Sequence, residues 1–229
     1  MKSIRETIKK IVRIFHSPAF YYQKSFSQEG EDIIINRLIQ GKKNGFYVEV
    51  GCHHPFRFSN TYFFYQRGWR GICIDPLPNT VKLFNRFRPR DIAIEKGVSL
   101  FPGVMRYFLF NEPALNTFDE EIAKSRDGKN NCSIKNIAEI ETIRLSSILL
   151  DNNAPREIDL LSVDVEGYDL QVLQSNDWEK FKPKLIIAET LEADMCTLDS
   201  DPLSGFLKEK GYKPYAKTGN SVIFCLEVL

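Results

Sequence analysis

The stretch GFYVEVGCHHP, from Gly45 to Pro55, decides the fold. Its first six residues are a short apolar run of the kind that builds a buried parallel strand. Gly51 follows directly, and a glycine there lets the chain turn sharply and lets a ligand approach the backbone. Because ligands of open α/β sheets bind beyond the carboxyl ends of the strands, we predict a strand over Gly45–Val50 with a binding site after it.

The rest of the chain repeats this alternation of short apolar runs and helical segments. The further predicted strands are Gly71–Ile74, Asp91–Ile94, Asp159–Val165 and Lys184–Glu189, and the predicted helices are Pro78–Arg88 and Tyr168–Gln174. Two last strands, Tyr212–Lys217 and Ser221–Leu226, flank a Thr-Gly-Asn sequence that indicates an antiparallel hairpin. The pattern predicts an α/β fold with a mostly parallel, doubly wound, seven-stranded sheet and a C-terminal antiparallel hairpin.

The chain has 229 residues, which suits one such domain. Apolar residues recur at helical spacing among lysines and arginines from Ile4 to Phe15. We therefore predict an amphipathic helical segment over residues 1–24 and the main domain over residues 25–229. The segment packs on the domain or a second subunit in one interpretation, and lies on a membrane surface in the other. No stretch approaches the roughly 18 apolar residues that a membrane span requires.

An interval over about residues 97–157 is too long for a simple connection between strands. It holds two strand candidates, Val104–Phe110 and Glu141–Leu145, with the polar run Lys124–Ser133 between them. Since long loops commonly cover binding sites, we expect this insertion to contribute to the pocket.

Charge and cysteine content exclude several classes of protein. The net charge is +1, so no bulk field favours a nucleic-acid partner. The five cysteines are scattered and include no CxxC pair, which argues against a zinc ribbon or a disulfide scaffold. A reduced, cytoplasmic location is the simplest interpretation.

The identity of the ligand is indicated by residues at the ends of the first two strands. Asp75 ends the second strand, 24 residues after Gly51, where a carboxylate can accept hydrogen bonds from ribose hydroxyls. A dinucleotide site needs further glycines around the pyrophosphate, but positions 53, 54 and 56 are His, His and Phe. S-adenosylmethionine has no phosphate, and its cationic sulfonium and ammonium favour acidic groups such as Glu49. The methyl donor is therefore preferred, with a plain turn glycine and a solvated aspartate as the alternative.

Three segments resemble the FkbM family of methyltransferases. They are Ser25–Ile39 (SFSQEGEDIIINRLI), Gly45–Pro78 and Ile158–Leu173 (IDLLSVDVEGYDLQVL), with weaker matches at Ala114–Phe118 and Leu185–Thr190. The resemblance implies a Rossmann-like methyltransferase fold, S-adenosylmethionine as donor and O-methylation as the usual reaction. Family acceptors are mostly sugars, glycan precursors and polyketide-type products. The sequence departs from many relatives in having CHHPF where they carry a small residue and then Asp-Gly.

The resemblance also implies which residues bind the donor. These are Gln28, Glu49, Gly51, Asn60, Thr61 and Asp75, to which we add Pro76, Ser99 and Asp164.

Methyl transfer to a hydroxyl requires alignment of the acceptor and removal of a proton. Asp164 stands at the carboxyl end of the fourth strand, and we predict it as the main acceptor-side carboxylate, assisted by Glu189. Either could also ligate a divalent metal ion through oxygen. The alternative is that these carboxylates cap the helices that follow. His53 and His54 are the other candidates for the base, since histidine transfers protons near neutral pH.

The sequence thus predicts an S-adenosylmethionine-dependent O-methyltransferase for a hydroxyl of a sugar, nucleotide sugar or glycan precursor. Arg57 could bind the phosphate of a nucleotide sugar. Two alternatives stay open, namely N- or C-methylation of another small molecule and a non-catalytic nucleoside-binding protein with the same fold. The expected partners are a small-molecule acceptor and a second copy of the chain in a homodimer.

Overall fold

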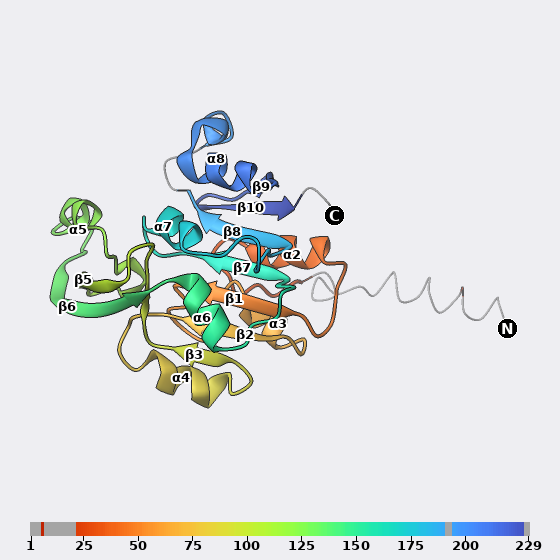
Figure 1. Cartoon of the computed structure of the whole chain (residues 1–229), viewed down its shortest axis with the longest axis horizontal. Helices are drawn as coiled ribbons and strands as arrows, with labels where there is room; N and C mark the ends of the chain where they lie inside the picture. The colour runs from red at the N-terminus through yellow and green to blue at the C-terminus, as the bar shows by residue number, and fades with distance from the viewer. Residues whose placement is uncertain (1–5, 7–21, 191–193, 227–229) are drawn as a thin grey trace.

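The computed structural model describes Glu6, residues 22–190 and residues 194–226 (Figure 1). Nearly all of the predicted N-terminal segment, residues 1–24, lies outside these residues, so the domain boundary after residue 24 stays a prediction. Of the helices within the described ranges, none has the length and apolar composition needed to cross a membrane.

Seven strands form the main sheet, in the order β3-β2-β1-β7-β8-β10-β9. Their bounds are β1 Phe46–Val50, β2 Arg70–Ile74, β3 Ile92–Ile94, β7 Leu160–Val163, β8 Leu185–Glu189, β9 Tyr212–Lys217 and β10 Ser221–Leu226. The first five are parallel, and β10 runs antiparallel to both β8 and β9. The predicted fold class is confirmed, including the C-terminal hairpin.

Helices cover both faces of this sheet. They are α2 Glu31–Leu38, α3 Tyr62–Tyr65, α4 Thr80–Phe87, α6 Leu145–Asp151, α7 Asp169–Gln174 and α8 Pro202–Glu209, with the 3₁₀ turn η3 Leu198–Ser200 before α8. Helix α5 Glu120–Arg126 and the 3₁₀ turn η2 Pro113–Leu115 belong to the insertion. Val48 and Val50 of β1 pack with α6, α7 and α8, whereas Tyr47 packs with α2, α3 and α4. Alternate residues of β1 therefore belong to the cores on opposite faces of the sheet. Glu49 consequently points to the same face as Tyr47.

The insertion forms a second sheet of three strands, in the order β4-β6-β5. The strands are β4 Gly97–Val98, β5 Gly103–Phe110 and β6 Ile134–Ile143. The strand predicted at Glu141–Leu145 is thus the end of a longer strand, and Leu145 already begins α6. Figure 1 shows this second sheet beside the carboxyl ends of the main parallel strands.

Candidate functional site

A cavity of about 290 Å³ lies where the carboxyl ends of β1, β2, β7 and β8 meet the insertion. The predicted site residues that line it are Gln28, Gly51, His53, Asn60, Asp75, Pro76, Asp164 and Glu189. The insertion contributes Tyr107, Glu112, Asn116 and Arg126 to the same wall, none of which the sequence singled out. One cavity therefore joins the two predicted parts of the site.

Asp75 is fixed at the end of β2 by the backbone. Its Oδ2 accepts the amide of His53 at 2.7 Å, and its Oδ1 accepts the amide of Leu77 at 2.8 Å. Burial raises the pKa of Asp75 to about 6. Each oxygen keeps a further lone pair, so the carboxylate is oriented to accept hydrogen bonds from a ligand in the cavity.

Gly51 brings the ends of β1 and β7 together. Its φ is +81°, and a Cβ atom there would lie 1.7 Å from the carbonyl oxygen of Asp164. The Asp164 amide in turn donates to the Val50 carbonyl at 3.0 Å. Any side chain at position 51 would push this turn away from the next, so glycine is required for the cavity to have its shape.

Four predicted site residues do not line the cavity, namely Glu49, Thr61, His54 and Ser99. Strand alternation turns Glu49 away from the core of Val48 and Val50, into the protein interior beneath the loop. There its Oε2 accepts the hydroxyl of Thr61 at 2.6 Å.

The other two residues serve the backbone. Nδ1 of His54 accepts the amides of Phe56 and Arg57, at 3.3 and 3.1 Å, and its ring packs edge-on against Phe56. Ser99 is 1% exposed, and its hydroxyl accepts the amide of Phe101. Both side chains are therefore occupied in holding local loops.

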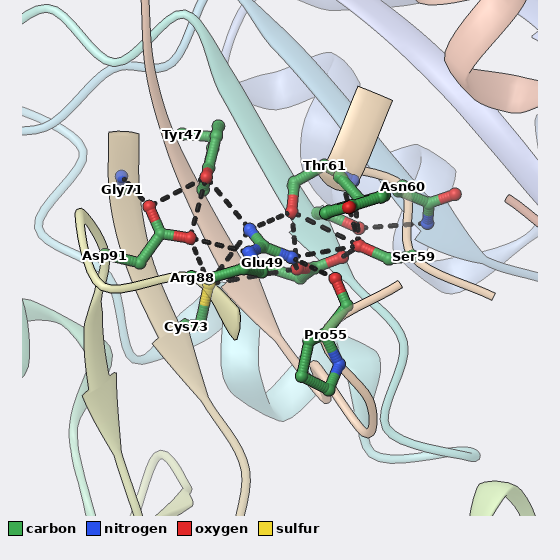
Figure 2. A network of polar contacts seen from close by, with 12 residues as sticks. Tyr47, Glu49, Pro55, Ser59, Asn60, Thr61, Gly71, Cys73, Arg88 and Asp91 are labelled. Carbon is green, nitrogen blue, oxygen red and sulfur yellow. Dashed lines mark hydrogen bonds and ion pairs between the residues drawn. The ribbon is translucent and has the colours of Figure 1, made fainter. Parts of the chain in front are cut away.

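The fully buried Arg88 guanidinium binds the β1–α3 loop, residues 51–61 (Figure 2). Nη1 donates to the Pro55 carbonyl at 3.1 Å, and Nη2 donates to the Thr61 hydroxyl at 2.7 Å. Nε donates to Asp91 at 2.7 Å, and Nη1 lies 3.5 Å from Glu49. We call these residues, with Tyr47 and Ser59, the Arg88 network. Apart from Asp91, the partners of Arg88 come from distant segments, so the local sequence does not mark Arg88.

Asp164, Glu166 and Glu189 form a carboxylate cluster, in which one oxygen from each lies within 4.8 Å of the others. Burial raises the pKa of Asp164 and of Glu189, and the neighbouring carboxylates raise both further. Arg126 pairs with Glu166, whereas Oε2 of Glu189 is buried with no hydrogen-bond partner. Such a cluster can hold a shared proton, or offer oxygen ligands to a divalent cation.

Helix capping does not account for this cluster. Helix α7 begins without a side-chain cap, and within the described ranges Asp164 and Glu166 accept no hydrogen bond from its backbone. Asp164 is therefore available to the cavity, whereas Glu166 is paired with Arg126.

The cavity is lined by more acidic than basic side chains. Each of its arginines and lysines is paired: Arg57 with Glu112, Lys96 with Glu141 and Arg126 with Glu166. In the part of the chain that the structure describes, no lysine or arginine lies within 4 Å of the carboxylates of Glu31, Asp75, Asp164 or Glu189. The arrangement favours a cationic ligand.

The sequence from residue 49 to residue 214 matches the family described as Methyltransferase FkbM domain, which is well over half of the chain. The chain belongs to the FkbM methyltransferase family. The family match confirms the resemblance predicted from the sequence, and it covers both the β1–α3 loop and the carboxylate cluster. No curated protein gives a significant match.

Solved structures resemble this FkbM chain at low sequence identity. A methyltransferase FkbM from Methylobacillus flagellatus KT shares 11% identity over 80% of this chain, with a TM-score of 0.47, and this chain spans only 43% of its length. A methyltransferase from Geobacter sulfurreducens shares 11% identity, covering 98% and 88% of the two chains, with a TM-score of 0.41. A TehB-like SAM-dependent methyltransferase from Corynebacterium glutamicum ATCC 13032 Kitasato shares 9%, covering 99% and 100%, with a TM-score of 0.42.

Replacing the buried arginine is expected to unfold this FkbM chain at lower denaturant concentration. Arg88→Met leaves Glu49 and Asp91 buried without their cation, at a cost of about 3–5 kcal/mol. Urea denaturation followed by circular dichroism measures the loss. Arg86→Met, at an exposed arginine in the last turn of α4, is the control and should change stability by less than about 1 kcal/mol. Equal losses in both variants would contradict the importance of the network.

Because of the carboxylate cluster, we expect the free energy of unfolding to fall as pH rises. Burial raises the pKa of Glu189, so the folded chain keeps a proton that the unfolded chain releases above about pH 4.5. Protonation thus favours the fold at low pH, and this contribution is lost as pH rises above that value. Glu189→Gln removes the titration and should melt about 2–4 °C above the wild-type chain at pH 8, corresponding to ~1 kcal/mol in a domain of this size.

Scanning calorimetry at pH 5 and pH 8 measures this effect. The advantage of Glu189→Gln should shrink at pH 5, where the unfolded chain also binds more protons. Glu209→Gln, at an exposed position at the end of α8, is the matched control and should show no pH-dependent difference. An equal shift at both pH values would show that Glu189 does not titrate in this way.

Proposed function

We propose that this chain is an S-adenosylmethionine-dependent O-methyltransferase that acts on a hydroxyl of a sugar, nucleotide sugar or glycan precursor. Family membership supplies the class of reaction. One observation supports the choice of donor. The Gly51 turn and the Asp75 carboxylate, which backbone amides hold in place, line one cavity. Every arginine and lysine of that cavity is paired with an acid, whereas several of its carboxylates have no basic partner. A nucleoside with cationic sulfonium and ammonium groups fits that chemistry.

The cavity residues divide into groups that suit the parts of this donor. Asp75 would accept hydrogen bonds from the ribose hydroxyls, and Pro76 and Val98 would flank the adenine. The amides of Gln28 and Asn60 would bind the methionine portion near Gly51. The volume of about 290 Å³ is close to the lower end of ligand pockets, roughly 300–1,000 Å³. The donor supplies a methyl carbon activated by sulfonium, and the protein has to orient the acceptor and remove its proton.

Three residues that the sequence predicted to bind the donor have a supporting role in this proposal, namely Glu49, Thr61 and Ser99. Their side chains are buried away from the cavity, so we assign them to the support of the loops that contact the donor. Glu49 does this through the Arg88 network, where it balances a buried cation.

Proton removal is assigned to Asp164, with Glu189 assisting. Both line the cavity, and their mutual repulsion and burial favour uptake of a proton. His53 is the second candidate, because burial lowers its pKa and keeps the imidazole neutral, and its Nδ1 has no hydrogen-bond partner. His54 is less suited, since loop amides occupy its Nδ1. Asp164, Glu166 and Glu189 would also be the ligands if the reaction uses a divalent cation.

We also propose a cytoplasmic location and leave the homodimer as an expectation. The five cysteines are all free in the structure, which agrees with a reducing compartment.

Donor binding is tested by calorimetry with S-adenosylhomocysteine. Wild-type protein should bind it, and Asp75→Ala should weaken binding at least about tenfold, since it removes a charged hydrogen-bond acceptor worth ~1.5 kcal/mol or more. Asp151→Ala, an exposed carboxylate outside the cavity, is the control and should bind like wild type. Absence of binding to wild type would overturn the proposed donor.

Proton removal is tested with Asp164→Asn. Loss of a general base lowers kcat by about 10²–10⁴-fold, while binding of S-adenosylhomocysteine should change less than about threefold. Mass spectrometry of candidate sugars and nucleotide sugars, incubated with the donor, detects the gain of one methyl group. Unchanged turnover would remove Asp164 from the mechanism, and methylation on nitrogen or carbon would favour the alternative reaction class.

The same methylation assay tests whether the reaction uses a divalent metal ion. Activity that disappears with a chelator and returns with Mg²⁺ or Mn²⁺ would assign the carboxylate cluster to metal binding, and activity that a chelator leaves unchanged would assign it to proton transfer.

A further inference from the structure

Phe58 combines two features that folding does not explain. It is a large aromatic residue that is 42% exposed, and its φ of +58° lies in the left-handed region, which is costly for a residue with a side chain. It also lines the mouth of the cavity. A strained backbone that presents an apolar ring to a cavity is typical of a binding residue.

The groups around Phe58 are polar and paired. The Arg57 guanidinium lies 4.3 Å from the centre of the Phe58 ring. Its Nη1 and Nη2 donate to Oε1 and Oε2 of Glu112, at 2.9 and 3.1 Å, so the loop after β1 is tied to the insertion by a two-bond ion pair. Glu112 thereby neutralises Arg57, the cation that could have bound a phosphate.

The other two basic residues of the cavity, Lys96 and Arg126, are also unavailable to bind an anion. Lys96 is paired with Glu141 and Arg126 with Glu166, while Asp164 and Glu189 add unpaired carboxyls deeper in the cavity. A diphosphate would therefore enter a site in which no free cation among the described residues balances its charge.

We propose that Phe58, Arg57 and Glu112 form the acceptor subsite, and that it takes an uncharged sugar ring and discriminates against a nucleoside-diphosphate sugar. A pyranose has an apolar C–H face, which packs on the electron-rich face of an aromatic ring. Its hydroxyls are donors and acceptors that the guanidinium and carboxylate edges of the Arg57–Glu112 pair can bind. This inference rests on the proposed function and narrows its acceptor.

The experiment compares two acceptor panels in the presence of donor. One contains methyl glycosides of common hexoses, and the other contains the matching nucleoside-diphosphate hexoses. Wild-type protein should methylate a glycoside with a kcat/KM at least about tenfold above that of its charged counterpart. The reverse preference, or turnover of neither panel by protein that binds S-adenosylhomocysteine, overturns the subsite. Protein that fails to bind S-adenosylhomocysteine instead contradicts the proposed function itself.

Phe58→Ala should raise the KM for the glycoside about tenfold or more and change kcat less, because it removes ground-state binding. Phe87→Ala is a matched control, since Phe87 is also 42% exposed but does not line the cavity. Phe58→Gly should melt above Phe58→Ala, because glycine relieves the left-handed backbone. Equal effects of Phe58→Ala and Phe87→Ala on KM would overturn the role of Phe58.

Glu112→Gln tests the charge argument directly. The substitution frees the positive charge of Arg57, so binding of uridine diphosphate, measured by calorimetry, should strengthen about tenfold over wild type. Glu139→Gln, an exposed glutamate on β6, is the control and should leave that affinity unchanged. Tight uridine diphosphate binding by wild type, or no gain in Glu112→Gln, would contradict discrimination by charge.

Discussion

The buried guanidinium of Arg88 is the constraint on which the rest of the site depends. Arg88 belongs to the segment between α4 and β3, and it binds the loop that follows β1 through a backbone carbonyl and two hydroxyls. A charge without partners in the interior is so unfavourable that these partners must stay in place. The loop is therefore held by a cation that does not line the cavity (Figure 2). Other residues of the same loop, among them Gly51 and His53, do line it.

Two residues of this loop have a strained backbone. His53 and Phe58 have positive φ, and both line the cavity. Such conformations persist only when surrounding contacts determine them. Here the amide of His53 donates to Asp75 at 2.7 Å, and Ser59, which follows Phe58, accepts a hydrogen bond from Arg88 at 3.2 Å.

Electrostatics divides the cavity into two regions with different tasks. At the rim, Arg57 and Glu112 neutralise each other's charge, and their polar atoms can still hydrogen-bond to a ligand. Deeper, burial and mutual repulsion leave Asp164 and Glu189 with a raised affinity for protons. An acidic interior attracts a cationic donor and can receive a proton, so one charge distribution serves both binding and the chemistry that we propose.

The sequence by itself determined the strands of the main sheet, the hairpin bounds and the fold class, because apolar periodicity and strand ends are encoded locally. Strand ends also marked Gly51, Asp75, Asp164 and Glu189 as site residues, whereas Gln28 and Asn60 came from the resemblance to the family. Only the tertiary structure decided that Glu49 points beneath the loop, that strand β6 extends back to Ile134, and that Arg57 meets a glutamate 55 residues away. These outcomes depend on which distant segments pack together and on how a buried charge finds its partners, and no local pattern specifies either.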